Sequence, residues 1–355
     1  MTSAQAAVFS VPGTHPVLQS VALPRLVSGE ALVRVSCCTI CGSDVHSWTG
    51  KRQTPLPTIL GHEIVGVVEG LGSDEPPVDL NGEPLAIGDR IVWAVVASCG
   101  RCDRCVAGMP QKCRFAWKYG HQALNDVVPG HQHTAPLSGG LATHCHLVPG
   151  TAVVRVPTGV PDELASTATC AGATVMNALA AAGELKGKRL LVTGAGMLGL
   201  LACAAAGLQS PASTTVVDLN VGRLNDARRL GASLGSTEVP QGQFDILIEC
   251  TGNSALTTAA ISRLDLGGRA ILVGAVYPDD PLPIDAQSIV RRLITIRGIH
   301  NYTAQDLAAA LSFFAGSDAS ALFKDLIGRR IPLSDVDSWV SESEKGSAAR
   351  VAVIP

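Results

Sequence analysis

The sequence lacks an excess of charge of either sign. Its 355 residues include 27 lysines and arginines against 30 aspartates and glutamates, for a net charge of -3. A protein that binds nucleic acid must neutralise phosphates and therefore gathers basic residues on one face. We expect no nucleic-acid partner for this chain.

The sequence also lacks a signal peptide, internal repeats, low-complexity tracts and a charged tail. Its first residues, MTSAQAAVFSVPGTHP, have neither the basic start nor the apolar core of an export signal. We therefore expect a cytoplasmic chain whose eleven cysteines are reduced.

One uncharged run, from Leu190 to Val217, has the length of a membrane span. Gly194, Gly196, Gly199 and Pro211 interrupt it. This pattern predicts a strand, a turn and a buried helix, and we expect no association with a membrane.

The length of the chain predicts two domains, because one hydrophobic core seldom holds 355 residues. In the first 160 residues, short β-branched runs at 31–38, 64–72, 89–97 and 151–157 are separated by Gly and Pro, which predicts an all-β segment. From about Pro161 onwards helices alternate with apolar strands, as in a parallel sheet with crossover helices.

The second segment predicts a regular series of elements. The expected strands are 189–194, 214–218, 233–236, 244–250, 269–275 and 293–298, and the expected helices are 197–208, 221–231 and 254–264. A helix at 304–316 and an apolar run at 349–355 no longer follow this rhythm, and we expect them to return to the first domain and complete it.

Four cysteines form a C-x2-C-x2-C-x7-C array within fifteen residues: Cys99, Cys102, Cys105 and Cys113. Four thiolates at this spacing can surround one zinc ion tetrahedrally and leave no position for a substrate. Disulfides would require an oxidising compartment, and unrelated reduced cysteines would not produce this period. The array predicts a structural zinc site.

A glycine-rich turn, G-x-G-x-x-G, follows the strand expected at 189–194 and begins a helix. Its residues are Gly194, Ala195, Gly196, Met197, Leu198 and Gly199. Such a turn lets backbone N–H groups and the helix N-terminus approach a pyrophosphate. Asp218 ends the next strand, where a carboxylate can accept hydrogen bonds from the adenosine ribose and repel a 2'-phosphate. The pattern predicts NAD in preference to NADP, although Arg223 nearby weakens that preference; the alternative is a tight turn that only caps a buried helix.

A second candidate metal site comes from residues far apart in the sequence. Cys41 and His62, in the segments C-G-S-D-x-H and G-H-E, are good zinc ligands, and Cys170 is the best candidate for a third. Two cysteines and one histidine leave the fourth position for water or a substrate oxygen. The alternative is that each is an ordinary buried residue.

Together these segments resemble the zinc-dependent medium-chain alcohol dehydrogenase family over essentially the whole chain. The resemblance includes G-H-E-x2-G-x5-G from Gly61 to Gly72, the four-cysteine lobe and the dinucleotide turn. It implies a catalytic zinc held by Cys41, His62 and Cys170, with Glu63 able to join the ligands, and a second, structural zinc. Asp44 would orient His62, while Ser43 and His46 would relay the hydroxyl proton to solvent.

The same resemblance implies an α/β plus β fold, a GroES-like catalytic domain with an inserted Rossmann dinucleotide-binding domain. We expect residues 1–170, including a zinc lobe at about 95–115, and residues 300–355 to form the catalytic domain, and residues 171–299 to bind NAD. Family members form dimers or tetramers through the Rossmann domain, so a homodimer or homotetramer is expected.

The substrate is implied less directly. The phrases KYGH, LSGGLATHCHL and RGIHNY resemble a branch of the family associated with phosphonate metabolism, whereas LNDVVPGHQH departs from it locally. Lys51, Arg52, Lys118 and His121 would form a cationic rim for an anionic alcohol of the phosphonate type, with His300 and Asn301 as further contacts. The alternatives are a solvated charged loop, with neutral diols, polyols or secondary alcohols as substrates.

Proteins of other classes fit the sequence less well. A zinc-finger module would gather basic residues, but the cysteine lobe mixes Arg101, Arg104, Lys112 and Arg114 with Asp103. A non-catalytic zinc and dinucleotide-binding protein, or a zinc-free reductase, would not need the set of Cys41, Ser43, His62 and Cys170 together. An enzyme is the preferred interpretation.

Overall fold

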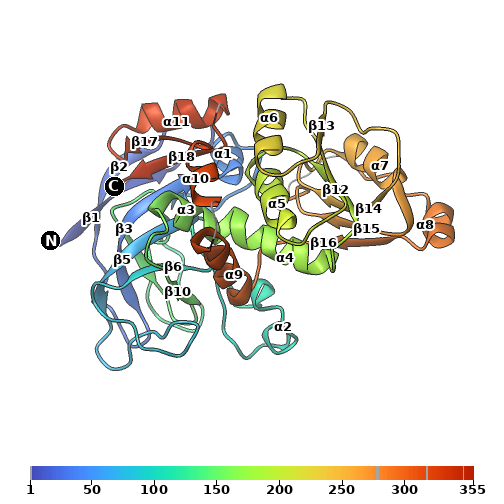
Figure 1. Ribbon diagram of the computed structural model, residues 1–355. Helices are drawn as coiled ribbons and strands as arrows, with labels where there is room; N and C mark the ends of the chain where they lie inside the picture. The colour runs from blue at the N-terminus through green and yellow to red at the C-terminus, as the bar shows by residue number, and fades with distance from the viewer. Residues whose placement is uncertain (1, 277–279, 317–318, 347) are drawn as a thin grey trace. The chain divides into compact units, whose positions relative to one another are not determined.

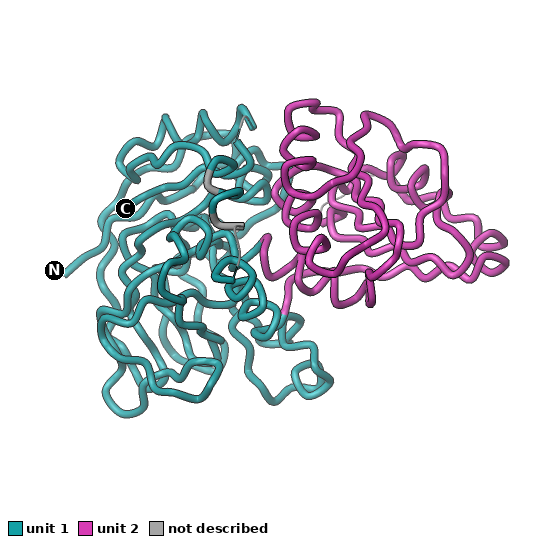
Figure 2. Tube along the Cα trace, viewed as in Figure 1, with its two compact units in different colours: residues 1–170, 303–355 teal, residues 171–302 magenta. Residues whose placement is uncertain are grey.

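The computed structural model describes residues 2–276, 280–316, 319–346 and 348–355. Contacts divide the chain into two compact units, one of residues 1–170 with 303–355 and the other of residues 171–302 (Figure 2). Unit 1 is thus built from both ends of the chain, and unit 2 is inserted between them.

Unit 1 is organised around a seven-stranded sheet with the order β10-β6-β5-β3-β18-β17, in which β9 also pairs with β3. Two smaller sheets, β2-β1-β4 and β7-β8, accompany it. The bounds are β1 Ser3–Phe9, β2 Val17–Ala22, β3 Ala31–Ile40, β4 Thr58–Ile59, β5 Glu63–Leu71, β6 Arg90–Trp93, β7 Val96–Ala97, β8 Trp117–Lys118, β9 His144–Leu147, β10 Val153–Arg155, β17 Ile327–Pro332 and β18 Arg350–Ile354.

Helices of unit 1 are short and lie between these strands or near the C-terminus. They are α1 Gly42–Trp48, α2 Asp103–Val106, α3 Asp162–Thr167, α9 Ala304–Ala315, α10 Ala319–Lys324 and α11 Val336–Lys345, with a 3-10 turn at Pro110–Lys112. A π-helical turn, Ala168–Gly172, follows α3. The expected helix at 304–316 is therefore present as α9.

Strand β3 brings distant parts of unit 1 together. It pairs antiparallel with β5, where Thr39 lies opposite Glu63, and antiparallel with β18, where Cys38 lies opposite Val353 (Figure 1). The C-terminal strand consequently lies beside the end of β3 and the start of α1.

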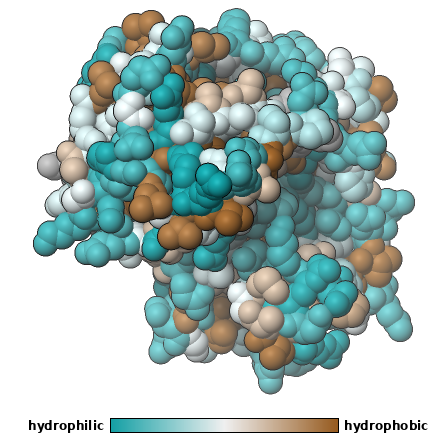
Figure 3. Space-filling view, turned by 90° about the vertical axis from the view of Figure 1, so that its right-hand side faces the viewer, coloured by the Kyte–Doolittle hydropathy of each residue, from teal (hydrophilic) through white to brown (hydrophobic). Residues whose placement is uncertain are grey.

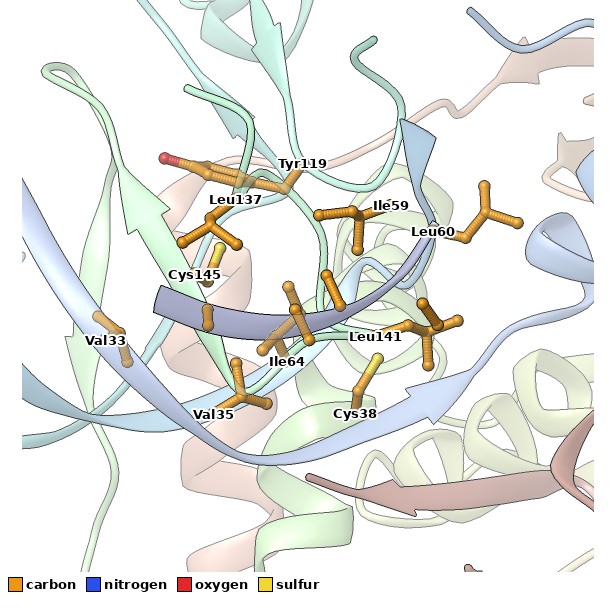
Figure 4. Close-up of a cluster of buried hydrophobic side chains, with 14 of the residues drawn as sticks. Val33, Val35, Cys38, Ile59, Leu60, Ile64, Tyr119, Leu137, Leu141 and Cys145 are labelled. Carbon is orange, nitrogen blue, oxygen red and sulfur yellow. The ribbon is translucent and has the colours of Figure 1, made fainter. Parts of the chain in front are cut away.

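The core of unit 1 is a cluster of buried aliphatic and small side chains. Figure 4 shows Val33, Val35 and Cys38 from β3 with Ile64 from β5 and Leu141 from the loop before β9. All five are less than a tenth exposed. This packing fixes the strands whose ends carry the metal-site residues described below.

Unit 2 contains one six-stranded parallel sheet with the order β13-β12-β11-β14-β15-β16, which is the strand order of a Rossmann fold. The bounds are β11 Arg189–Thr193, β12 Ser213–Val217, β13 Leu234–Ser236, β14 Phe244–Glu249, β15 Leu264–Leu272 and β16 Thr295–Gly298; α4 Ala173–Ala182, α5 Met197–Gly207, α6 Val221–Arg229, α7 Ser254–Ser262 and α8 Ala286–Arg292. The six strands and three helices expected from the sequence are confirmed, while α4 and α8 were not predicted.

The run from Leu190 to Val217 forms β11, α5 and β12, as expected. Another stretch, Asp162–Ala182, is helical and apolar enough to cross a membrane by length and composition alone, yet 67% of its most apolar window is buried inside the structure. The stretch Asp162–Ala182 is therefore interpreted as a core helix.

On the face shown in Figure 3, hydrophobic residues form small separate patches among hydrophilic ones.

Candidate active site

The first part of the site is the N-terminus of α1. Cys41 caps this helix, and its backbone N–H donates to Asp44 Oδ2 at 2.9 Å. Asp44 is 1% exposed, and its other oxygen, Oδ1, accepts from the backbone N–H of Gly61 and contacts His62 Nδ1, both at 3.1 Å. One carboxylate therefore fixes Cys41 and His62 relative to each other.

Gly61 of the G-H-E segment has a steric reason to be glycine. Its φ is +89°, and a Cβ at this position would lie 2.6 Å from Cys38 Sγ and 3.0 Å from the backbone nitrogen of Leu141. A side chain here would move the backbone away from β3 and shift His62 away from Asp44.

Cys170 reaches the site through hydrogen bonds between buried hydroxyls and strand ends. Ser166 Oγ donates to the carbonyl of Glu63 at 2.6 Å and accepts from the N–H of Thr39 at 3.0 Å, and Thr169 Oγ1 accepts from the N–H of Ile64 at 3.2 Å. The π-helical turn that contains Cys170 is thereby held against β3 and β5. Turns of this kind are frequent at functional sites.

One ligand atom from each of Cys41, His62 and Cys170 lies within 4.8 Å of the others. Because Asp44 contacts Nδ1 of His62, Nε2 is left for a metal. A hydrogen bond with Cys170 and the charge of Arg350 hold the pKa of Cys41 well below its usual range, which favours the thiolate that zinc binds. Two sulfurs and one imidazole fit a zinc ion with an open fourth position.

Ser43 and His46 both belong to α1. Ser43 Oγ lies 3.3 Å from His62 Nε2, so the hydroxyl is at the metal site. His46 is half-buried on the same helix, and burial with the charges of Lys51 and Arg52 lowers its pKa. Ser43 thus lies beside His62, and His46 follows it by three residues, or about one helical turn, on α1.

Glu63 is fully buried, and both of its carboxylate oxygens accept hydrogen bonds. Its Oε2 accepts from Thr39 Oγ1 at 2.6 Å and from Arg350 Nε at 2.8 Å, and its Oε1 accepts from Arg350 Nη2 at 2.8 Å. Arg350 Nη2 also lies 3.7 Å from Cys41 Sγ. Sequence reasoning missed Arg350 and Thr39, because only the pairing of β3 with β5 and β18 brings them here.

The four-cysteine lobe has the geometry of a second metal site. The sulfurs of Cys99, Cys102, Cys105 and Cys113 all lie within 4.8 Å of one another. Cys102 Sγ and Cys105 Sγ are 3.5 Å apart, far beyond a disulfide bond of about 2.05 Å. Cys113 Sγ accepts from the backbone N–H groups of Cys99 and Phe115, both at 3.3 Å. Four sulfurs supported in this way fit a tetrahedral, closed zinc site.

The glycine turn in unit 2 connects β11 to α5. Gly194 has a φ of +90°, and a Cβ on Gly199 would lie 1.8 Å from the carbonyl oxygen of Gly194. Gly196 caps α5, and Met197 and Leu198 form its first turn. The turn thus has the close strand-to-helix packing that is typical of a dinucleotide-binding turn.

Asp218 follows β12 and is half-buried. Its Oδ2 accepts from the backbone N–H of Ala195 at 2.6 Å, and its Oδ1 accepts from that of Asn220 at 2.7 Å. The carboxylate therefore lies directly beside the glycine turn. The backbone N–H of Arg223 donates to the side chain of Asn220, the residue that caps α6, at 3.2 Å, so Arg223 lies in the first turn of this helix.

Comparison with known proteins agrees with these two units. The sequence-family model of the alcohol dehydrogenase GroES-like domain matches residues 27–158. The sequence-family model of the zinc-binding dehydrogenase matches residues 194–316. The chain belongs to the zinc-dependent medium-chain alcohol dehydrogenase family. The expected fold class, a GroES-like domain with an inserted Rossmann domain, is confirmed, and the protein is an oxidoreductase of CH–OH groups that uses zinc and a nicotinamide cofactor.

This dehydrogenase is 29% identical to the L-threonine 3-dehydrogenase of Vibrio cholerae serotype O1 over 303 residues, which are 80% of either chain. It is 28% identical to an alcohol dehydrogenase of Thermotoga maritima, with a TM-score of 0.90 and 99% of both chains covered. A protein of Sinorhizobium meliloti 1021, described as a zinc-binding dehydrogenase and solved with NADP, shares the fold at 23% identity, with a TM-score of 0.84 and both chains fully covered.

The sequence predicts a cationic rim of Lys51, Arg52, Lys118 and His121 near the catalytic ligands of the dehydrogenase, and the structure differs from this prediction at His121. Burial and the charge of Arg52 lower the pKa of Lys118 to about 8. The charge of Lys118 also interacts with Cys41 and Cys170. His121 is buried, its ring centroid lies 5.1 Å from that of His62, and its Nδ1 donates to the carbonyl of Tyr119 at 2.8 Å.

Burial, aided by the charge of Lys118, holds the pKa of His121 well below its usual range, so its ring is neutral. The expectation of a cationic His121 is wrong, because the side chain is desolvated. Lys51 is exposed. His300 and Asn301 belong to unit 2, and the backbone carbonyl of Asn301 accepts a hydrogen bond from Asn177 Nδ2 at 3.0 Å. Of the expected rim, Lys118 and Arg52 are therefore the two cations that are not fully exposed, in addition to Arg350 beside Cys41.

Proposed function

We propose that this protein is a zinc-dependent, NAD-linked alcohol dehydrogenase that interconverts a small anionic alcohol and its carbonyl compound. The observation that carries this proposal is the cluster of Cys41, His62 and Cys170, with the Ser43 hydroxyl 3.3 Å from His62 Nε2. A bound zinc polarises the substrate oxygen, and a bound nicotinamide accepts or returns the hydride.

The residues of the chain hold the reacting groups and move the proton. Asp44 orients His62, and Cys41 and Cys170 would each supply a thiolate to the metal. The Ser43 hydroxyl accepts the proton of the substrate alcohol and passes one on, and His46, half-buried on the same helix, transfers it towards solvent. Glu63 stays paired with Arg350, and the positive charge of Arg350 lies close to the sulfur of Cys41.

The variant Ser43→Ala tests the proton path. General acid–base transfer contributes about 100-fold to 10,000-fold, so we expect kcat for alcohol oxidation to fall by about that factor while NAD affinity is unchanged. Thr49→Ala is the matched control, because Thr49 Oγ1 at the end of the same helix bonds only to backbone carbonyls. An unchanged kcat in Ser43→Ala would remove Ser43 from the mechanism.

Lys118 and Arg52 support an anionic substrate. The charges of Lys118 and Arg52 influence each other, and the charge of Lys118 also interacts with the ligand residues Cys41 and Cys170. A phosphonate or a carboxylate on the carbon skeleton of the alcohol would pair with them. The phosphonate-type alcohol predicted from the sequence has this chemistry, as does L-threonine, the substrate named for the Vibrio cholerae relative.

A kinetic panel separates the candidates. It pairs hydroxyalkyl phosphonates with uncharged isosteres of the same skeleton, and adds L-threonine, 3-hydroxy acids, neutral diols and secondary alcohols. We expect kcat/KM to be at least about tenfold higher for the anionic member of each pair, which corresponds to 1.4 kcal/mol. A consistent preference for the neutral members would establish the diol, polyol or secondary-alcohol alternative.

NAD is the proposed cofactor because Asp218 places a carboxylate beside the turn of Gly194 to Gly199.

We also propose a cytoplasmic location, in keeping with eleven free cysteines, and assembly into a homodimer or homotetramer. The predicted strand at 269–275 forms part of β15, which lies inside the sheet, so β13 and β16 are the edge strands that pairing between subunits could use. Light scattering at several concentrations measures the assembly.

A further inference from the structure

A third group of metal-ligating residues lies in unit 1, apart from both cysteine sites. One ligand atom from each of Glu30, His133 and His146 lies within 4.8 Å of the others. None of the three belongs to the ligand sets expected for a dehydrogenase of this family. His133 is part of LNDVVPGHQH, the segment that departs locally from the related sequences.

The three residues come from separate elements that the fold brings together. Glu30 immediately precedes β3, His146 lies on β9 opposite Leu32 of β3, and His133 lies in the loop that precedes β9. Figure 4 shows Cys145, the neighbour of His146, among the core side chains. Because alternate residues of a strand point to opposite faces, His146 lies on the other face of β9.

Contacts around Glu30 converge on its two oxygens. His133 Nε2 lies 2.7 Å from Oε1, and His146 Nε2 lies 3.0 Å from Oε2. Two atoms that share one zinc ion in a tetrahedral shell lie about 3.3 Å apart, given metal–ligand distances of about 2.0 to 2.2 Å. Both observed separations are somewhat shorter than that value, so the three side chains would move slightly apart to admit the ion.

The ring nitrogens of His146 are buried without a hydrogen-bond partner among the described residues, which a simple histidine–carboxylate pair does not explain. The side chains of His146 and Glu30 are 0% exposed, yet among the described residues neither ring nitrogen of His146 has a hydrogen-bond partner. The 3.0 Å approach of Nε2 to Glu30 thus lacks hydrogen-bond geometry. Leaving a buried polar atom unsatisfied is costly, whereas two ligands of one cation approach each other without a hydrogen bond.

We propose that Glu30, His133 and His146 bind a third divalent cation of the zinc class. Two imidazoles and one carboxylate suit zinc and similar first-row metals, whereas magnesium and calcium prefer oxygen ligands. The His133 side chain is 32% exposed and gives the ion a route from solvent, and water completes the shell. The site ties the loop of His133 to the beginning of β3 and to β9.

The loop is built to present His133. The backbone N–H of Val128 donates to the carbonyl of His133 at 3.0 Å, and Val127 and Thr134 form an isolated bridge, so the segment closes on itself as a narrow hairpin. Glu30 is fixed in turn, since its Oε2 accepts from the backbone N–H of Val27 at 3.0 Å. The metal would cross-link two segments that are each ordered locally.

The test is a metal count on the full-length protein, using zinc as the probe. Protein equilibrated with Zn²⁺ and then desalted is analysed by inductively coupled plasma mass spectrometry for zinc per chain. We expect three equivalents in the unmodified protein and two in His133→Ala. His15→Ala is the matched control, because His15 also pairs with a carboxylate, Asp337 at 2.6 Å, but is in no ligand cluster among the described residues; it should keep three equivalents.

Cobalt separates this site from the cysteine sites. Filling it with Co²⁺ adds visible d–d absorption with no added thiolate charge-transfer band, because it has no sulfur ligand, and His133→Ala removes that increment. His133→Gln gives a second variant that retains a side chain of similar reach in case the alanine variant misfolds. Two equivalents of zinc in the unmodified protein, or the same zinc content in it and in both variants, would show that the cluster is only an ion pair and overturn the proposal.

Discussion

Arg350 forms a two-pronged ion pair with Glu63, with Nε to Oε2 and Nη2 to Oε1 each at 2.8 Å. The side chains are 8% and 0% exposed. Glu63 begins β5 and Arg350 begins β18, which lies near the end of the chain, so the pair joins residues 287 positions apart. The C-terminal strand is thereby part of the metal site, through the charge that Arg350 presents to Cys41.

Replacing Arg350 should therefore destabilise the protein strongly. Arg350→Met leaves the Glu63 carboxylate buried without its cation, and breaking a buried pair in this way costs about 3 to 5 kcal/mol. Urea unfolding of unit 1, followed by the fluorescence of its tryptophans, measures the loss. The double variant Glu63→Gln/Arg350→Met removes both charges and should recover most of the stability; a single variant as stable as the unmodified protein would contradict this account.

Asp44 should control the catalytic zinc and leave the structural zinc unchanged. Asp44→Asn keeps the shape of the side chain but removes the charge that contacts His62 Nδ1, and loss of such an outer partner weakens metal binding about 10-fold to 100-fold. Competition with a chromophoric chelator should show one zinc per chain leaving more readily. Equal retention of both zinc ions would mean that Asp44 only caps α1.

Local patterns in the sequence predicted those parts of the site that lie within one short segment. The cysteine array, the glycine turn and the acid after the next strand each have a fixed spacing, because a zinc lobe and a strand-turn-helix unit are local structures. The six parallel strands of unit 2 followed from apolar runs separated by helices in the same way.

Residues brought in by long-range pairing could not be found in this manner. Ser166, Thr169 and Arg350 act through the backbone or side chains of strands distant in sequence, and a lone Ser, Thr or Arg carries no spacing signal. The neutral state of His121 likewise follows from burial, which its position in the sequence does not reveal. Cys170 was predicted from its position at the expected junction of the two domains and from the resemblance to the dehydrogenase family, and not from local spacing.

Asp218 should determine the choice of cofactor. In Asp218→Asn the charge that hydrogen-bonds ribose hydroxyls and repels a 2'-phosphate is lost, while one oxygen remains to accept from the Ala195 N–H. Hydrogen bonds to charged groups contribute about 1.5 to 3 kcal/mol, so kcat/KM with NAD should fall about 10-fold to 100-fold and the ratio of NAD to NADP should narrow. Asp226→Asn, on α6, is the control, and an unchanged ratio in Asp218→Asn would exclude this role.

Lys118 should give an anionic substrate a pH dependence that a neutral one lacks. Burial and Arg52 lower the pKa of Lys118 to about 8, so the ammonium group is present below that pH and is lost above it. We expect KM for the anionic alcohol to be constant below pH 8 and to rise by up to about tenfold per pH unit above it, as expected for loss of one proton from the free enzyme.

Arginine at position 118 provides the decisive comparison, because a guanidinium keeps its charge throughout this range. Lys118→Arg should abolish the rise in KM up to pH 10, whereas Lys118→Met should give a high KM at every pH. The uncharged isostere of the same substrate, assayed in parallel, should show no such step with any of the three proteins. If the isostere shows the same rise in KM as the anion, the titration reports on the metal site or the proton path, and Lys118 does not bind the charge of the substrate.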